Sequence, residues 1–109
     1  MARPVIWTES FARDLDAVAE YIARDSPRYA ASFVREVRDA ARSLSHFAER
    51  GRMVPEFGSP AIRELFLRSY RLIYHLGPDT VSILALIHGA RDLASRWEEE
   101  GRPPVDDVV

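Results

Sequence analysis

The chain contains no cysteine among its 109 residues. This absence excludes a disulfide framework and any metal site built on thiolates. Lysine, asparagine and glutamine are also absent, and all fifteen basic residues are arginine. No lysine can therefore act as a catalytic base or form a Schiff base with a substrate.

Long apolar runs are missing as well. No stretch approaches the roughly 20 residues needed to cross a bilayer, and Met1–Trp7 lacks the apolar region of a signal peptide. We therefore expect a cytoplasmic protein with no membrane partner. A chain of this length buries roughly two-thirds of its surface as one domain, which we place at residues 1–100. Residues 101–109 are expected to form a flexible acidic tail.

Charge is distributed unevenly, although the net charge is only -2. Residues 50–91 carry six arginines against three acidic residues, whereas residues 92–109 carry two arginines against six. A basic region beside an acidic tail suits an acidic partner or nucleic acid. An ordinary mixed surface is the simpler interpretation of the same counts, because the whole domain is not basic.

Two amphipathic helices are predicted in the first half of the chain. Thr8 is a suitable helix N-cap, and Ser26-Pro27 both ends the first helix and opens the second. We expect the second helix to end at Arg50-Gly51. The short joint makes the pair an antiparallel hairpin. The apolar stripes are Phe11, Leu15, Val18, Ala19 and Ile22, then Ala30, Phe33, Val34, Val37, Ala41, Leu44 and Phe47.

Strand patterns occupy most of the chain outside the two predicted helices. Pro4–Trp7 reads as an edge strand, Arg52–Ala61 as a long loop, and a short helix is expected to follow Arg91 through Trp97. The turn residues Gly77–Thr80 predict a tight antiparallel hairpin. The fold class is therefore α+β, with the order β-α-α-β-β-β and the helix hairpin packed on a mainly antiparallel three- to four-stranded sheet. The three later strands are Ile62–Leu67, Tyr70–Leu76 and Val81–Ile87.

No phosphate-binding loop, dinucleotide fingerprint, nucleophile elbow or zinc spacing is present. The three histidines, His46, His75 and His88, do not share ligand spacing on one element. The sequence therefore predicts neither a metal nor another cofactor. Strand alternation places Arg71 and His75 on one face of the sheet, opposite Tyr70, Leu72, Tyr74 and Leu76.

One group of side chains has the chemistry of a catalytic site: Arg63, Arg71, His88 and Arg91. Arginines on one sheet can hold a phosphate with paired hydrogen bonds, and a histidine can move protons. These residues would suit a metal-free ribonuclease. The same arginines can instead pair with acidic residues of the chain or of a partner protein, and the strand register decides whether they converge. The candidate acids in the chain are Glu56, Glu64 and Asp92.

The order of these elements and motifs resembles the RelE/ParE superfamily, the toxins of type II toxin–antitoxin (plasmid stabilisation) modules. The resemblance covers nearly the whole chain. The matching segments are Val5-Ile6-Trp7, Asp14-Leu15-Asp16 with Tyr21-Ile22-Ala23, Asp25-Ser26-Pro27, Gly51-Arg52 with Val54-Pro55-Glu56, Ile62-Arg63-Glu64-Leu65, Tyr70-Arg71 with Ile73-Tyr74, and Ile87-His88-Gly89-Ala90-Arg91.

The resemblance implies one of two targets. RelE-like members cut messenger RNA on the ribosome, whereas ParE-like members poison DNA gyrase. The catalytic arginines of the RelE-like branch match Arg71 and Arg91, but their earlier basic pair falls on Arg63 and Leu65, so one charge is missing. Their late stacking tyrosine falls near Trp97, which has no phenolic proton.

The acidic chain and the Ile62-Arg63-Glu64-Leu65 segment favour the ParE-like branch. The resemblance then implies a toxin that poisons DNA gyrase and is neutralised in a hetero-oligomer with a cognate antitoxin. The expected antitoxin- or target-binding residues are Arg63, Arg71, Arg91 and Trp97. A RelE-like ribosome-dependent endonuclease is the first alternative, with His88 joining the three arginines as catalytic residues. An inactive family member that acts only as a binding module is the second.

Overall fold

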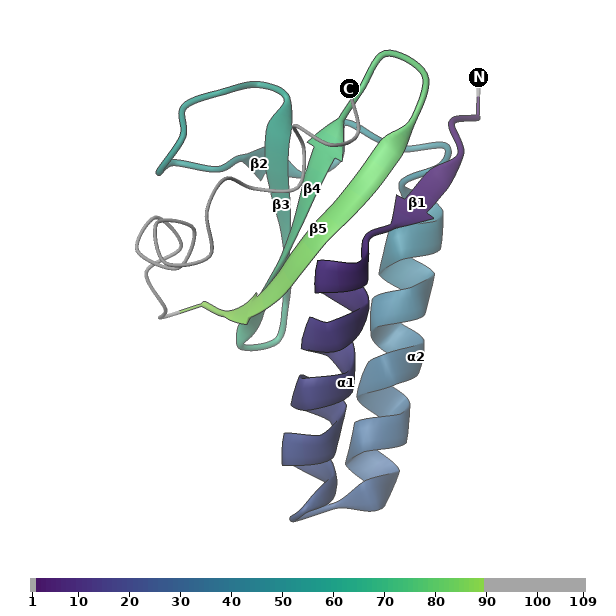
Figure 1. The fold of residues 1–109 in the computed structure, drawn as a ribbon, viewed down its shortest axis with the longest axis vertical. Coiled ribbons are helices and arrows are strands. Elements are labelled where there is room, and N and C mark those ends of the chain that lie inside the picture. Colours follow the sequence, from purple (N-terminus) through teal and green to yellow (C-terminus); the bar gives the residue numbers. More distant parts are fainter. Residues whose placement is uncertain (1, 90–109) are drawn as a thin grey trace.

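The computed structural model describes residues 2–89. Two helices lie on one side of a five-stranded sheet and extend beyond its lower end (Figure 1). The strand order is β1-β5-β4-β3-β2, and only the β1–β5 pair is parallel. Within these residues, no helix is long and apolar enough to span a membrane. The elements are β1 (Val5–Trp7), α1 (Glu9–Ala23), α2 (Pro27–Ser43), β2 (Arg52–Met53), β3 (Ile62–Leu67), β4 (Tyr70–Leu76) and β5 (Val81–His88).

The α+β prediction is confirmed, with two corrections to the elements. The sheet has five strands because the expected loop Arg52–Ala61 begins with the short strand β2, which pairs with β3. The second helix ends at Ser43 rather than at Arg50. Its end is fixed by tertiary hydrogen bonds: the Arg3 N–H donates to Ser45 O at 2.8 Å, and Ser45 Oγ donates to Arg3 O at 2.8 Å. These bonds draw the chain after α2 toward the start of β1.

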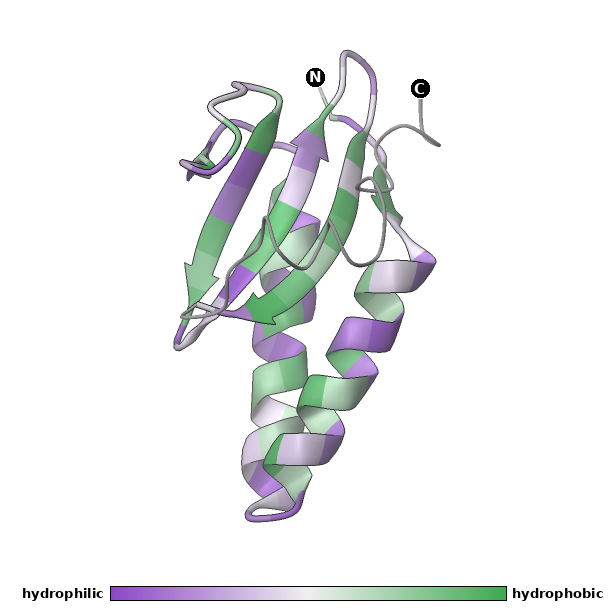
Figure 2. Cartoon of the chain, turned by 60° about the vertical axis from the view of Figure 1, so that its left-hand side comes forward, coloured by the Kyte–Doolittle hydropathy of each residue, from purple (hydrophilic) through white to green (hydrophobic). Residues whose placement is uncertain are grey.

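The helix starts agree with the sequence prediction. The Thr8 hydroxyl accepts a hydrogen bond from Phe11 N at 3.2 Å, and the Ser26 hydroxyl accepts one from Tyr29 N at 3.1 Å. Each bond satisfies an amide that the helix leaves without an intrahelical acceptor. Polar and apolar residues then alternate around both helices at helical spacing (Figure 2). Phe47, expected on the apolar stripe, is instead 66% exposed because α2 ends before it.

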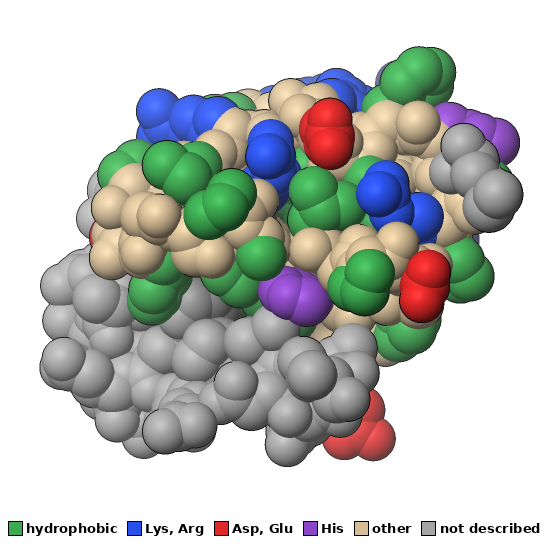
Figure 3. All heavy atoms as spheres, turned by 90° about the horizontal axis from the view of Figure 1, so that it is seen from above, with side chains coloured by type: hydrophobic (Ala, Val, Ile, Leu, Met, Phe, Trp, Pro, Cys, Tyr) green, Lys and Arg blue, Asp and Glu red, His purple; other side chains and the backbone are tan. Residues whose placement is uncertain are grey.

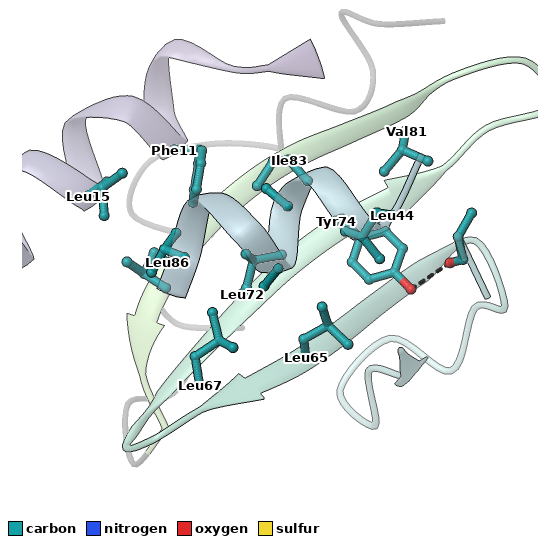
Figure 4. Close-up of a cluster of buried hydrophobic side chains, with 14 of the residues drawn as sticks. Phe11, Leu15, Leu44, Leu65, Leu67, Leu72, Tyr74, Val81, Ile83 and Leu86 are labelled. Atoms are coloured by element: carbon teal, nitrogen blue, oxygen red, sulfur yellow. Dashed lines mark hydrogen bonds between the residues drawn. The ribbon is translucent and has the colours of Figure 1, made fainter. Parts of the chain in front are cut away.

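The main core lies between the helices and the sheet (Figure 4). Leu72 and Tyr74 point into it, whereas Ile73 belongs to a second apolar cluster on the opposite face, as the alternation predicted. A shift of register between Ile73 and Tyr74 leaves Leu84 as the extra residue of β5. Such a bulge bends the strand locally. The second cluster is Val54, Ile62, Ile73, Leu84, Ala85 and Ile87.

Tyr74 ties the segment after α2 to the sheet. Its side chain is fully buried, and its hydroxyl donates to Ala48 O at 2.6 Å and accepts from Gly51 N at 3.0 Å. A Cβ at Gly51 would lie 2.6 Å from that hydroxyl and 2.7 Å from Glu64 O, so only glycine fits there. The hydroxyl thus satisfies two backbone groups of the chain between α2 and β2.

We predict that Tyr74→Phe lowers the free energy of unfolding by about 1–3 kcal/mol, because it leaves these backbone groups without a partner in a buried site. Chemical denaturation of the purified chain measures this change. Tyr21→Phe is the matched control, since Tyr21 is 63% exposed. Equal, small effects of both substitutions would show that the Tyr74 hydroxyl does not stabilise the fold.

Candidate functional site

The guanidinium of Arg71 is enclosed by two carboxylates on the sheet face opposite the helices. Arg71 is 5% exposed, and its Nε donates to Glu64 Oε1 at 2.6 Å. Its two terminal nitrogens donate to the two oxygens of Glu56 at 2.9 and 3.0 Å. The Arg71–Glu56 contact is therefore the bidentate pairing in which arginine binds carboxylate most specifically.

Glu64 extends this pairing into a chain of alternating charges. Its side chain is 1% exposed, and its second oxygen accepts from Arg52 Nε at 2.7 Å. Arg52 is solvent-accessible and lies over the ring of Phe66, 4.8 Å from the centroid. We refer to Arg52, Glu64, Arg71 and Glu56 as the charge chain. Its two positive charges face two negative ones, so it presents no net charge.

The charge chain limits what Arg71 can do chemically. The hydrogen bonds that Arg71 donates to Glu56, and then those that it donates to Glu64, raise the pKa of Arg71 against the opposing effect of burial. A phosphate would have to displace Glu56 and would then lie close to the buried carboxylate of Glu64. Like charges at that distance repel strongly in a poorly solvated site. The arrangement stabilises the sheet face and commits all three nitrogens of the Arg71 guanidinium to carboxylates of the same chain.

The described members of the predicted catalytic group are not brought together. Arg63 lies opposite Tyr74 in the register and thus on the helix side, whereas Arg71 faces the other way. The Arg63 guanidinium donates to three backbone carbonyls, with Pro60 O at 2.9 Å and Gly51 O at 3.0 Å as the shorter contacts. The Arg63 guanidinium thereby links Gly51, before β2, to Pro60, after it. Register therefore separates the two arginines.

The remaining candidates lie elsewhere. His88 ends β5 opposite Tyr70, and the two rings meet edge to face with centroids 5.5 Å apart. Arg91 and Trp97, and with them the expected third helix and the tail 101–109, lie outside the described residues.

Within residues 2–89, no group of three or more histidine or acidic side chains could hold a metal ion. The end of the molecule remote from the helix joint carries acidic, basic and apolar side chains side by side (Figure 3).

Of the two roles that the sequence suggested for Arg71, the structure shows pairing with acidic residues of the same chain, Glu56 and Glu64. The sequence analysis did not predict that Arg52 belongs to the charge chain. Arg52 reaches Glu64 because β2 pairs with β3. The sequence analysis also missed a neighbouring polar pair, His75 and Ser82, which are cross-strand partners. Neither His75 Nδ1 nor Ser82 Oγ has a hydrogen-bond partner, and burial lowers the pKa of His75.

Comparisons with known proteins match toxins that carry two names, ParE and RelE. A family model described as the ParE toxin of type II toxin-antitoxin system, parDE, matches residues 5–93. Toxin RelE2 of Caulobacter vibrioides is 33% identical over 88 residues, covering 80% of this chain and 96% of the relative.

Two solved structures share the fold. The chromosomal ParDE toxin–antitoxin system from P. aeruginosa gives a TM-score of 0.66 at 23% identity, covering 80% of this chain and 96% of that one. The toxin–antitoxin complex RelBE2 from Mycobacterium tuberculosis gives 0.55 at 26% identity, covering 81% and 99%. The first likeness concerns the fold alone.

We predict that Glu64→Gln destabilises the chain by about 3 kcal/mol, because it leaves the buried guanidinium of Arg71 with only one carboxylate. Asp39→Asn is the control: Asp39 lies 3.7 Å from Arg42 with both side chains more than 75% exposed, and such pairs contribute little. Chemical denaturation compares the two variants. A Glu64→Gln effect as small as that of the control would mean that the charge chain does not stabilise the sheet.

The lowered pKa of His75 predicts a pH dependence of stability. As pH falls below about 6.5, the unfolded chain takes up a proton at this residue that folded His75 resists binding. Stability should therefore decline between about pH 7.5 and pH 5.5, and decline less in His75→Gln. Denaturation at both pH values measures the difference. An identical decline in the two proteins would contradict the assignment to His75.

Proposed function

The chain belongs to the ParE toxin family of type II toxin–antitoxin systems, and we propose that it arrests growth by binding and poisoning DNA gyrase. It is a type II toxin of the RelE/ParE superfamily, and the choice of target is the proposed step. The charge chain carries this proposal, because it occupies the arginine that a ribonuclease of this superfamily would need at the scissile phosphate.

Catalysis by phosphate stabilisation requires donors that point at the place where negative charge develops. In this chain, the donors of Arg71 already point at Glu56 and Glu64. Arg63 is committed to backbone carbonyls on the opposite face, and His88 lies at the end of β5. These positions support a toxin that acts by binding rather than by cleaving RNA. The assignment of antitoxin- or target-binding contacts to Arg63, Arg91 and Trp97 stays a prediction.

A RelE-like ribonuclease is the second candidate. Its support comes from names: the C. vibrioides relative is called Toxin RelE2, and one similar structure is a RelBE2 complex. In this alternative, Glu56 would have to leave Arg71 when the ribosome binds. A family member that has lost activity and only binds its partner is the third candidate.

We further propose that a cognate antitoxin neutralises the toxin in a hetero-oligomer. The two solved structures named above come from toxin–antitoxin systems, and the matching family model describes the toxin of such a system. Antitoxin segments of this kind fold as they bind, so they can wrap a small toxin and cover more than one of its surfaces. Neutralisation would then need no chemical change in the toxin.

The target is tested by inducing the chain in cells and measuring plasmid supercoiling and messenger integrity in the same arrested culture. We expect growth arrest, loss of gyrase supercoiling and intact messages, all reversed by co-expression of the protein encoded beside the toxin. Cut messages with normal supercoiling would replace gyrase by the ribosome as the target. Normal growth would leave only the inactive binding module.

A further inference from the structure

The outer edge of β1 is open. β1 lies at the margin of the sheet and pairs only with β5 (Figure 1). Val81 N donates to Pro4 O at 2.9 Å, and Thr8 N donates to Ile83 O at 3.2 Å, so alternate residues of this strand face β5. The amides and carbonyls of the residues between, Val5 and Trp7, therefore point away from the sheet.

A hollow lies along this open edge. It has a volume of about 380 Å³ and is lined by Val5 and Trp7 of β1 and by Arg38 and Arg42 of α2. We call it the β1 hollow. Trp7 is 39% exposed, and its ring is held edge to face against Phe11 with centroids 4.9 Å apart. The hollow thus combines a fixed aromatic wall with two arginines and free backbone groups.

The arginines of the hollow are poorly neutralised. Among the described residues, no acidic side chain forms an ion pair with Arg38, and Arg42 has only the solvent-exposed contact with Asp39 at 3.7 Å. Glu36, the other acid of α2, is taken by Arg68 at 2.9 Å. This differs from the charge chain, in which every arginine has a carboxylate within 3 Å. The charges beside β1 are available to a partner.

These features select one kind of occupant. Free strand amides and carbonyls suit an extended polypeptide that adds a strand to the sheet. The two arginines require that polypeptide to be acidic, and the aromatic wall requires an apolar side chain. A second copy of this chain fits poorly, because pairing two β1 edges about a twofold axis would bring Arg38 and Arg42 close to their equivalents.

We propose that the β1 hollow binds an extended segment of the antitoxin, in which an apolar side chain is flanked by acidic residues. The segment pairs with the outward backbone groups of Val5 and Trp7 and places its carboxylates on Arg38 and Arg42. This assignment rests on the proposed function, since it requires an antitoxin. It locates neutralisation on the side of the toxin away from the charge chain and β2.

Binding of the purified antitoxin, the protein encoded beside the toxin, tests the assignment by titration calorimetry. Arg38→Glu with Arg42→Glu reverses both charges, and we expect affinity to fall by at least about tenfold. Val5→Pro removes an outward amide without removing a bond to β5, and a similar loss is expected. Arg28→Glu is the matched control, because Arg28 is also an exposed arginine of α2 but does not line the hollow; its affinity should stay within about twofold.

Thermal unfolding checks that each variant is folded. If Val5→Pro does not fold, the charge-reversal variant alone tests the proposal. Wild-type affinity should also weaken between about 0.05 and 0.5 M salt, more steeply than that of the charge-reversal variant. Wild-type binding with unchanged affinity in the variants would overturn the β1 hollow and leave the proposed function intact. Failure of the wild-type chain to bind the antitoxin would overturn the β1 hollow together with the proposed toxin–antitoxin complex.

Discussion

The buried carboxylate of Glu64 organises one whole face of this protein. A carboxylate that is 1% exposed is stable only when its charge is compensated at close range. Arg71 from β4 and Arg52 from β2 supply that compensation at 2.6 and 2.7 Å. The same contacts fix the orientation of Arg71, bring β2 against β3, and place Glu56 of the following loop on the remaining donors of Arg71.

The arginines of this chain, which contains no lysine, fall into two groups according to their partners. The arginines around Glu64 neutralise acids of the same chain and hold the sheet together. Those beside β1 have weak partners or none among the described residues, and they adjoin an open strand edge. In the proposed function, growth inhibition by binding needs no chemistry at Arg71, and the arginines beside β1 belong to the separate surface on which we propose that the antitoxin binds.

Local signals in the sequence were sufficient for much of the fold. Thr8 and Ser26 predicted both helix starts, and the alternation around Arg71 predicted its face of the sheet. Long-range contacts were not predictable. The end of α2 depends on hydrogen bonds between Ser45 and Arg3, which lie far apart in sequence. The separation of Arg63 from Arg71 depends on strand register, which no local pattern sets when the polar residues of β3 can face either way.

Replacement of the buried pair by apolar residues, Arg71→Met with Glu64→Leu, tests the structural role of Arg71 most directly. Well-packed apolar side chains can substitute for a buried ion pair without loss of stability, and Arg52 and Glu56 keep access to solvent. If Arg71 serves only the fold, the folded double variant arrests growth as strongly as the parent chain when both are induced to equal levels. A folded double variant that no longer arrests growth would show that the Arg71 guanidinium acts on the target itself.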